Sequence, residues 1–477
     1  MNSRTKPIIL SALTLLCCTV PCIAAEKPNV LFIAVDDLRP ELGIYGSQGM
    51  VTPNIDRLAK KGVRFERAYC MVPTCGASRA ALMTGIRPAS DRFLTHLARA
   101  SEDAPGITTL NTHFKNNGYK TVSLGKIYHH PDDNAAGWSE KPWRSDAPNY
   151  ALKASLTKMG KNQKGETRGP SWENGGDLPD ETYADGQLAK HAIGKLETLA
   201  AGKDPFFLAV GFLKPHLPFV APGAYYDLYP AGSVKIPENY FPPKNAPPGA
   251  VHNSGELRGY SDIPKKGVLP EDKARELIRG YRAAASYTDT QIGEVLDALD
   301  RLGLAENTII VLWGDHGWNL GEHTMWCKHS CFETSLRAPL LFAAPDAIGL
   351  KSGAATGSFA EFIDIYPTLC DLTGLPKPDH LKGISLMPVL KDPEVQVKQQ
   401  AISRFANGDT IRTATHRYTV YRDQKGKQGG HMLYDHVKDP GENINVADDP
   451  ANASIVADLA KRLEEGMGKP GDFKENK

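Results

Sequence analysis

Uninterrupted apolar runs recur along most of the chain. Residues 29–35, Asn-Val-Leu-Phe-Ile-Ala-Val, are continuously apolar after Asn29 and contain several β-branched side chains. Such a run is typical of a strand that is buried on both faces of a parallel sheet. Residues 121–124, 206–211, 307–313 and 339–344 have the same character. The pattern therefore predicts a set of buried strands in one sheet.

Helical patterns lie between these runs. The clearest spans Glu271 to Leu302, where apolar side chains recur near the helical period. Shorter helices are predicted after Thr52, with proline at the first helical position, at 78–83 and at 359–372. Strands that alternate with helices predict an α/β fold, with a large and mostly parallel sheet flanked by helices.

The pattern changes in the last part of the chain. Residues 410–422 and 431–434 are predicted to be antiparallel strands, and 451–467 a closing amphipathic helix. We therefore expect an N-terminal α/β catalytic domain at 26–390 and a smaller C-terminal α+β subdomain at 391–477.

Residues 1–25 have the features of a signal peptide. Arg4 and Lys6 precede a short apolar stretch, which ends in the small residues Ala24 and Ala25. A membrane anchor is the alternative, but the stretch is short for a span and contains proline. No later segment is long and apolar enough to cross a membrane. We expect an exported protein, periplasmic or secreted, with no transmembrane segment once the signal is removed.

Charge and cysteine content narrow the function classes. Lys and Arg number 56 and Asp and Glu 55, so the net charge is +1. This balance gives no sign of nucleic-acid binding or of a polybasic membrane patch. Five of the eight cysteines follow the predicted signal, so at least one is unpaired. Cys327 and Cys331 are spaced for a short-loop disulfide, which the sequence leaves open.

Acidic residues follow two of the predicted strands. Asp36-Asp37 ends the first strand, and Gly314-Asp315-His316 follows the strand at 307–313. Adjacent carboxylates repel each other unless a cation compensates their charge. Oxygen ligands favour a hard cation such as Ca²⁺ or Mg²⁺, for which a histidine is a less usual ligand. Either pair alone is also compatible with turn capping, but together they predict a metal site.

Cys75 stands just before a predicted helix, four residues ahead of Arg79. A thiol at a helix N-terminus near an arginine is expected to have a lowered pKa and to be reactive. A buried structural cysteine is the simpler alternative. Cationic groups also gather near predicted strand ends, in segments that contain Lys126 with His129, Lys214 with His216, and His323 with Lys328. With a divalent cation they would form a pocket for a tetrahedral oxyanion, sulfate or phosphate.

These motifs together resemble a known family. Cys75-x-Ala77-x-Arg79, followed by Leu-Met-Thr-Gly, resembles the formylglycine signature of the type I sulfatases. The other motifs occur in that family's order, and three of them are most similar to the iduronate-2-sulfatase-like branch. They are Gly125-Lys126-x-x-His129, Lys214-Pro215-His216-x-Pro218-Phe219 and Asp315-His316-Gly317-Trp318-x-Leu320-Gly321-Glu322-His323. The resemblance extends from about Asn29 to Glu442 and implies an alkaline-phosphatase-like sulfatase fold.

The resemblance also implies a mechanism. Cys75 would be oxidised by a formylglycine-generating maturation enzyme, and one hydroxyl of the hydrated aldehyde would attack sulfur. Lys126, Lys328 and the metal would hold the sulfuryl oxygens, and Arg79 would favour the ionised nucleophile. His216 with Lys328 would protonate the leaving oxygen, and His129 would accept the proton of the second hydroxyl. One Ca²⁺ would be bound by Asp36, Asp37, Cys75, Asp315 and His316.

The implied substrate is a sulfated carbohydrate. The branch favours 2-O-sulfated uronic-acid-type residues of a sulfated glycan such as a glycosaminoglycan. Residues 131–180 have little periodicity and are expected to form a long surface excursion near the site. Arg92, His96, His130 and the stretch from Trp138 to Trp143 offer side chains for a sugar-contacting wall, with solvated surface as the simpler alternative. Ala77 replaces the proline of the commoner signature, which leaves open the maturation system that converts Cys75.

Three alternatives stand beside this hypothesis. The first is a phosphonate monoester or phosphodiester hydrolase of the same superfamily. The second is an inactive protein that binds sulfated glycans. The third is a cysteine-dependent hydrolase that pairs Cys75 with His129 or His216, in which the paired acidic strand ends would have no role.

Overall fold

The computed structural model describes residues 27–162, 165–423 and 425–472. A seven-stranded sheet forms its centre, in the order β13-β2-β12-β9-β1-β7-β3. The strands are β1 (Asn29–Val35), β2 (Gly62–Tyr69), β3 (Lys120–Gly125), β7 (Phe206–Phe212), β9 (Thr308–Gly314), β12 (Leu340–Ala343) and β13 (Ala354–Glu361). Every neighbouring pair is parallel except those of β12, which is antiparallel to both β9 and β2. The α/β expectation is confirmed.

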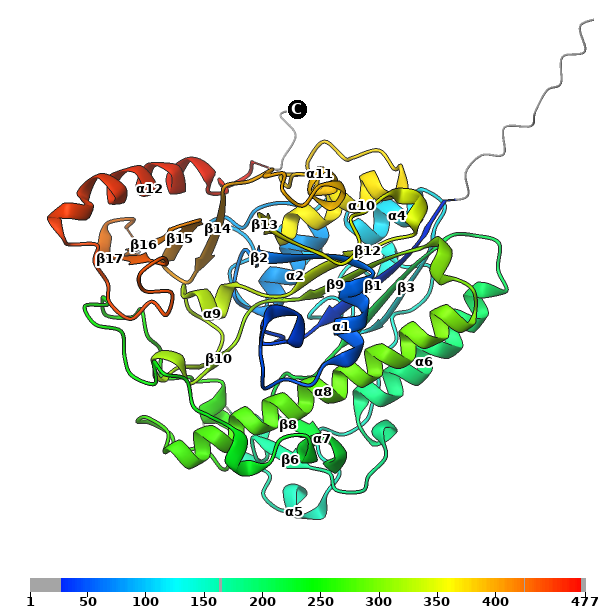
Figure 1. Ribbon diagram of the computed structural model, residues 1–477, viewed down its shortest axis with the longest axis horizontal. Helices are drawn as coiled ribbons and strands as arrows, with labels where there is room; N and C mark the ends of the chain where they lie inside the picture. The colour runs from blue at the N-terminus through cyan, green and yellow to red at the C-terminus, as the bar shows by residue number, and fades with distance from the viewer. Residues whose placement is uncertain (1–26, 163–164, 424, 473–477) are drawn as a thin grey trace, which may run out of the picture.

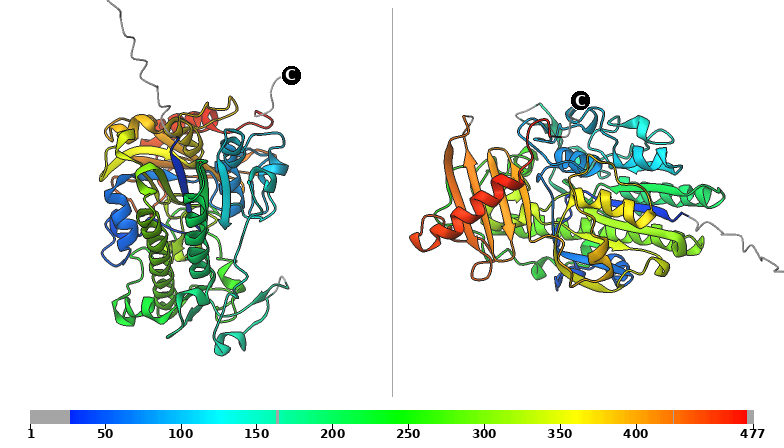
Figure 2. Two further views of the ribbon diagram at one scale, coloured as in Figure 1. Left: turned by 90° about the vertical axis from the view of Figure 1, so that its right-hand side faces the viewer. Right: turned by 90° about the horizontal axis from the view of Figure 1, so that it is seen from above.

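Helices cover both faces of this sheet (Figures 1 and 2). Alternate side chains of β1 enter two different hydrophobic clusters, since successive residues of a strand point to opposite faces. One cluster includes α2 (Cys75–Thr84), α4 (Leu110–Asn116) and α10 (Ile365–Thr373). The other includes α1 (Pro53–Lys60), α6 (Ala184–Ala200) and the long α8 (Glu271–Arg301). All seven residues of β1 are buried, which explains its uninterrupted apolar sequence.

A smaller antiparallel sheet lies at one end of the molecule. It consists of β14 (Gln400–Phe405), β15 (Gly408–Thr413), β16 (His416–Arg422) and β17 (Gln428–Asp435). Helix α12 (Ala453–Gly466) packs across it, as the right-hand view of Figure 2 shows. The smaller α+β unit is therefore present, while the division at residues 390 and 391 stays a prediction.

Two details differ from the sequence-based expectations. Residues 359–361 belong to strand β13, and the helix predicted at 359–372 begins only at Ile365. The strand continues because β13 pairs with β2, and a capping box between Glu361 and Asp364 then starts a short 3-10 turn, η9 (Phe362–Asp364). The stretch at 131–180 contains short elements, among them α5 (Lys153–Leu156) and β6 (Trp172–Asn174), which pairs with β8 (Phe219–Ala221).

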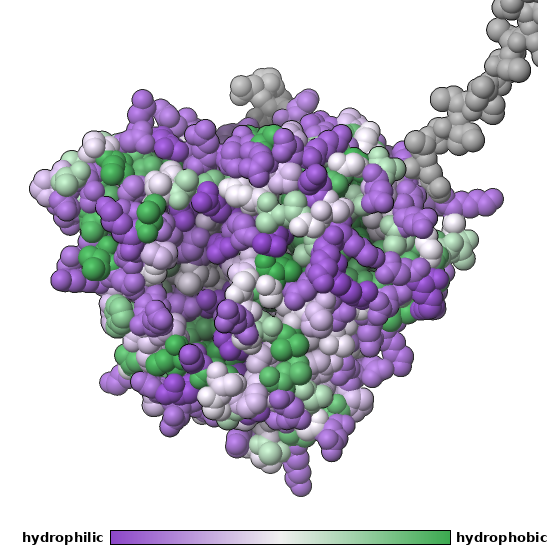
Figure 3. Space-filling view, in the orientation of Figure 1, coloured by the Kyte–Doolittle hydropathy of each residue, from purple (hydrophilic) through white to green (hydrophobic). Residues whose placement is uncertain are grey.

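Most of the face drawn in Figure 3 carries hydrophilic side chains, with hydrophobic ones in small separate groups. None of the helices in the described part of the chain is long and apolar enough to traverse a bilayer. The predicted signal peptide lies outside the described residues.

Candidate active site

The carboxyl ends of β1 and β9 place three aspartates together. Asp36 and Asp37 follow β1, Asp315 follows β9, and the two strands pair in parallel with Val35 opposite Gly314. The backbone amide of Asp37 donates to Asp315 Oδ1 at 3.0 Å. Carboxylate oxygens of the three aspartates lie within 4.8 Å of one another, and all three residues are fully buried. Three acidic groups thus share one edge of the sheet.

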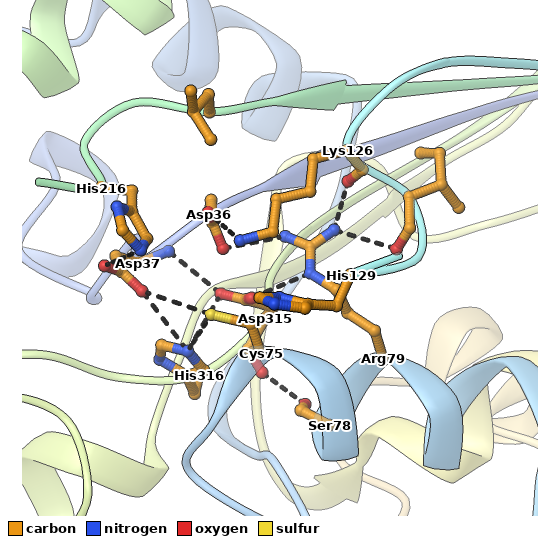
Figure 4. Close-up of polar contacts among 12 residues, drawn as sticks. Asp36, Asp37, Cys75, Ser78, Arg79, Lys126, His129, His216, Asp315 and His316 are labelled. Carbon is orange, nitrogen blue, oxygen red and sulfur yellow. Dashed lines mark hydrogen bonds and ion pairs between the residues drawn. The ribbon is translucent and has the colours of Figure 1, made fainter. Parts of the chain in front are cut away.

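Cys75 joins this group from the N-terminus of helix α2 (Figure 4). Its Sγ lies 3.3 Å from His316 Nε2 and 4.0 Å from Asp37 Oδ1. His316 Nδ1 contacts the carbonyl oxygen of Gly317 at 2.9 Å. A carbonyl only accepts, so Nδ1 carries the hydrogen and the lone pair of Nε2 faces the thiol and Asp37.

Two cations hold the Asp36 side of the centre. Arg79 lies one turn beyond Cys75 on α2, on the same helix face. Its guanidinium donates to Asp315 Oδ2 at 2.9 Å and to Asp36 Oδ1 at 3.2 Å. Lys126, directly after β3, donates to the other oxygen of Asp36. Arg79 also donates to the carbonyl groups of Lys126 and Ile127, so it ties together the ends of β1, β3 and β9.

A second group holds the Asp37 side. Lys328 Nζ donates to Asp37 Oδ1 at 3.0 Å and to Glu256 Oε1 at 3.0 Å, and lies over the ring of Trp318. His216, in the turn after β7, has its Nε2 3.4 Å from the same Glu256 oxygen and 3.8 Å from Asp37 Oδ2. Its Nδ1 contacts the carbonyl of Leu217 at 2.6 Å, which leaves Nε2 to face the centre.

Glu256 was not among the residues predicted from the sequence. It lies in the irregular segment between α7 (Gly223–Asp227) and α8, directly before the 3-10 turn η5 (Leu257–Gly259). This segment has no strand end, paired acid or periodicity that would have marked Glu256 as functional.

His129 lies farther along the loop that follows β3. Its ring centroid is 5.9 Å from that of His96 and 4.9 Å from that of His130. Its Nδ1 is enclosed and has no hydrogen-bond partner among the described residues. The guanidinium of Arg144 donates to the backbone carbonyls of Tyr128 and His129, which fixes this part of the loop. Figure 4 shows His129 with the other labelled residues of the centre.

The two adjacent aspartates differ in their pKa values. Burial alone would raise the pKa of Asp36, but the charges of Lys126 and Arg79 hold it well below its usual value. The pKa of Asp37 is raised well above its usual value, first by burial and then by its acidic neighbours, despite Lys328. The residues present therefore do not fully compensate three ionised aspartates in this buried place.

The expectation of a lowered pKa for Cys75 is wrong. Burial raises the pKa of the thiol well above its usual value, and the carboxylate of Asp36 adds to the effect. The helix N-terminus and the lysines do not outweigh this, because the thiol is fully enclosed and faces acidic groups. Burial, together with nearby cations, also lowers the pKa of both His129 and His216 to about 3.

Arg92 has different surroundings from those expected, and the structure decides the question that the sequence left open for Cys327 and Cys331. Arg92 is buried, and its guanidinium binds Asp472 and the carbonyl groups of Arg87 and Lys469. Through these contacts the buried Arg92 braces the C-terminal segment. The five described cysteines are free thiols, so no disulfide joins Cys327 to Cys331.

The chemistry of the centre fits a divalent cation. Oxygens of Asp36, Asp37 and Asp315 converge, and His316 Nε2 lies 3.4 Å from Asp37 Oδ1 and 3.6 Å from Asp315 Oδ1. Hard cations prefer such oxygen donors, and the raised pKa of Asp37 indicates that further positive charge is accommodated here.

The carboxyl edge of this α/β sheet brings together acidic ligands, Cys75 at a helix N-terminus and a ring of cations. This is the architecture of an ester hydrolase that acts on tetrahedral oxyanions. The chain belongs to the sulfatase family, because the family model described as "Sulfatase" matches residues 28–375. Residues 321–469 match "N-sulphoglucosamine sulphohydrolase, C-terminal". The resemblance found in the sequence is thereby confirmed, and the chain is a sulfatase of the iduronate-2-sulfatase-like branch.

Relatives agree with this assignment, and solved structures share the fold. Iduronate 2-sulfatase of Mus musculus is 36% identical over 391 residues, which cover 74% of this chain and 70% of the mouse protein. Delta 4,5-hexuronate-2-O-sulfatase of Bacteroides thetaiotaomicron is 27% identical over 492 residues, covering 95% and 92%. The structure of a phosphonate monoester hydrolase of Agrobacterium radiobacter has a TM-score of 0.75 at 23% identity, covers 92% of this chain and 95% of its own, and shows the shared fold.

Proposed function

We propose that this sulfatase removes 2-O-sulfate from uronic-acid-type residues of a sulfated glycan, using formylglycine at position 75 and one Ca²⁺. The observation that carries the proposal is the convergence of Cys75, three aspartates and His316 within a ring of cations. The names of two relatives, iduronate 2-sulfatase and hexuronate-2-O-sulfatase, support the choice of sugar.

The calcium ion would be held by Asp36, Asp37, Asp315, His316 and residue 75. When bound, it would supply positive charge that stabilises the sulfuryl oxygens and the ionised nucleophile. The carboxylate-rich donor set favours calcium over softer metals.

Residue 75 would supply the nucleophile after a maturation enzyme oxidises its thiol. The raised pKa of the Cys75 thiol supports this, because at neutral pH the unmodified group would be protonated and a poor nucleophile. The thiol also contacts His316, a proposed metal ligand, and this counts against the hydrolase that pairs Cys75 with His129 or His216.

The remaining side chains would bind the sulfuryl group or transfer protons. Lys126 on the Asp36 side and Lys328 on the Asp37 side hold ammonium groups where sulfuryl oxygens would be bound. His216 presents Nε2 beside Lys328 to protonate the leaving oxygen. It is neutral in the ligand-free chain, and an anionic ester bound nearby would favour its protonated form. His129, also neutral at its pKa of about 3, is free to accept a proton from the hydroxyl at position 75.

We also place the protein outside the cytoplasm, in the periplasm or secreted. The support is the basic and then apolar sequence of residues 1–25. N-terminal sequencing of the mature protein would test this, and an intact residue 1 would contradict it.

The deciding experiment measures desulfation of defined disaccharides by protein whose conversion at residue 75 has been verified by peptide mass. A disaccharide with a 2-O-sulfated uronic acid should be turned over faster than its 6-O- and N-sulfated isomers. The same phenol as a sulfate ester and as a phosphonate ester provides the control for reaction class. A preference for the phosphonate, or for another sulfate position, would overturn the proposal.

A further inference from the structure

Glu256 lies where two proposed proton donors meet. Its Oε1 accepts a hydrogen bond from Lys328 Nζ at 3.0 Å and lies 3.4 Å from His216 Nε2. These two residues come from distant parts of the chain, the turn after β7 and the loop after β11 (Trp326–Cys327). One carboxylate oxygen therefore contacts both side chains on the Asp37 side of the centre. It accepts from Lys328, and it can accept from Nε2 of His216 when that ring is protonated, because Nδ1 already donates to Leu217.

The surroundings of Glu256 are not those of a structural carboxylate. Its side chain is 17% exposed, and its other oxygen, Oε2, is enclosed without a hydrogen-bond donor among the described residues. A carboxylate that serves only to brace the fold is normally saturated by donors on both oxygens. Glu442, in contrast, accepts from Arg417 and His436 on one oxygen and from a backbone amide on the other.

We propose that Glu256 is a positioning residue, which holds Lys328 and His216 together beside the leaving oxygen of the sulfate ester. The inference rests on the proposed function, because it concerns the proton that passes to this oxygen when the S–O bond breaks and the oxygen takes the bonding electrons. Lys328 also binds Asp37, a proposed metal ligand. Without Glu256, the contacts left to its ammonium group within the described part of the chain would be that aspartate and the ring of Trp318.

The leaving group provides the test, because a sugar alkoxide needs a proton as it departs and a nitrophenolate does not. In Glu256→Gln, kcat on the sulfated disaccharide should fall about 10- to 100-fold, within the range for general acid catalysis, with KM changed less than about threefold. On p-nitrophenyl sulfate kcat should fall less than about threefold. Equal losses on both substrates, or no loss on the disaccharide, would overturn the inference.

A second measurement uses the disaccharide alone. If Glu256 acts through His216, its substitution should have little further effect in a His216→Gln background, so the double variant should be nearly as active as His216→Gln. Independent losses that multiply in the double variant would contradict the positioning role.

Three controls distinguish a positioning role for Glu256 from a structural or a metal-binding role. Glu256→Asp keeps the charge and should recover part of the rate, whereas a structural defect would be seen as a lowered melting temperature in both variants. Glu276→Gln removes a carboxylate that contacts Lys273 on α8, outside the centre, and should leave both substrates unaffected. Calcium should raise the melting temperature of Glu256→Gln as much as that of the unsubstituted protein; loss of this effect would make Glu256 a metal ligand instead.

The outcome for the proposed function can be read separately. If the unsubstituted protein desulfates the disaccharide and Glu256→Gln equals it, only the inference about Glu256 fails. If the unsubstituted and converted protein releases no sulfate from either substrate, the proposed function itself is wrong.

Discussion

Two clusters of carboxylates in this molecule are similar in the spacing of their potential ligand atoms and differ in the cations around them. The active centre gathers Asp36, Asp37 and Asp315, and the junction with the C-terminal sheet gathers Glu333 and Glu442 with His436. In each cluster the potential ligand atoms lie within 4.8 Å of one another. Proximity of acidic groups alone therefore does not identify a metal site.

The donors around each cluster make the difference. At the junction, Glu333 accepts from Tyr69, Arg412 and Arg417, and Glu442 accepts from Arg417 and His436. Guanidinium groups remain charged and match carboxylates in shape. Burial would raise both pKa values, but these cations hold them below the usual range.

In the active centre Asp36 is held by Arg79 and Lys126 in the same way, whereas Asp37 accepts from one lysine, Lys328. The pKa of Asp37 is raised by burial and by neighbouring carboxylates, although Lys328 touches it. The junction is thus an ionic network in which cations compensate the carboxylates, and it joins α9 (Glu333–Leu336) to β15 and β16. In the centre the negative charge at Asp37 is not fully compensated. The saturation of each carboxylate by donors, and not the proximity of the carboxylates, therefore separates this structural cluster from the centre.

The largest expected effect comes from Asp36→Asn. This change removes a proposed calcium ligand and the anchor of Lys126, so kcat should fall at least about 10⁴-fold, equivalent to about 5.5 kcal/mol. The fold should persist, as measured by circular dichroism. Asp435→Asn, on β17 and away from the centre, is the control and should keep full activity. Retention of a tenth of the activity by Asp36→Asn would refute the assignment.

At the junction, a substitution is expected to lower folding stability and to leave kcat nearly unchanged. Arg417→Met leaves Glu333 and Glu442 without a shared partner, and breaking a buried ion pair on one side costs about 3–5 kcal/mol of folding stability. Denaturant unfolding should show this loss, while kcat per folded molecule stays within about twofold because no catalytic group is touched. A lowered kcat with unchanged stability would mean that the junction communicates with the centre.

Calcium should raise the melting temperature through the active centre and not through the junction, an effect smaller than those of the two substitutions above. At a free concentration of about 100 times Kd, a ligand that binds only the folded state adds about 2.7 kcal/mol. A calcium-dependent rise in melting temperature is therefore expected for the unsubstituted protein and for Glu442→Gln, and should disappear in Asp315→Asn. If Glu442→Gln abolished the response, the metal would be bound at the junction.

Much of the centre could be predicted because parallel strands end at one edge of a sheet. β1, β3, β7 and β9 are apolar runs followed by short motifs, so Asp36, Lys126, His216 and Asp315 could be placed near one another from the sequence alone. Cys75 follows the same logic, because helix α2 begins at that edge. Each position depends on local pattern and strand order.

What could not be predicted depends on packing between distant segments. Glu256 comes from an irregular stretch, and only the folded chain brings it to Lys328. The thiol pKa of Cys75 was predicted with the wrong sign, since the sequence shows the helix N-terminus and Arg79 but not the burial beside Asp36. The start of α10 was placed too early because the pairing of β13 with β2 outweighs an apolar pattern that fits helix and strand alike.

The smallest expected effect is a difference in pH dependence between the two clusters in metal-free protein. The folded-state pKa of Asp37 is raised, so its stabilising contribution is complete below its unfolded pKa of about 4 and is lost as pH rises through the folded value. The pKa of Glu442 is lowered, so its contribution is present above about pH 4.5 and is lost as pH falls through the folded value. Each unit by which a pKa is displaced corresponds to about 1.4 kcal/mol.

Urea unfolding of the metal-free proteins at each pH would measure this difference. Relative to the unsubstituted protein, the stability of Asp37→Asn should increase from pH 4 to pH 8, and that of Glu442→Gln should decrease from pH 3 to pH 6. Saturating calcium should reverse the first trend and leave the second unchanged, because only the first arises from uncompensated negative charge; parallel trends in both variants would show that the two clusters do not differ in the way their contacts indicate.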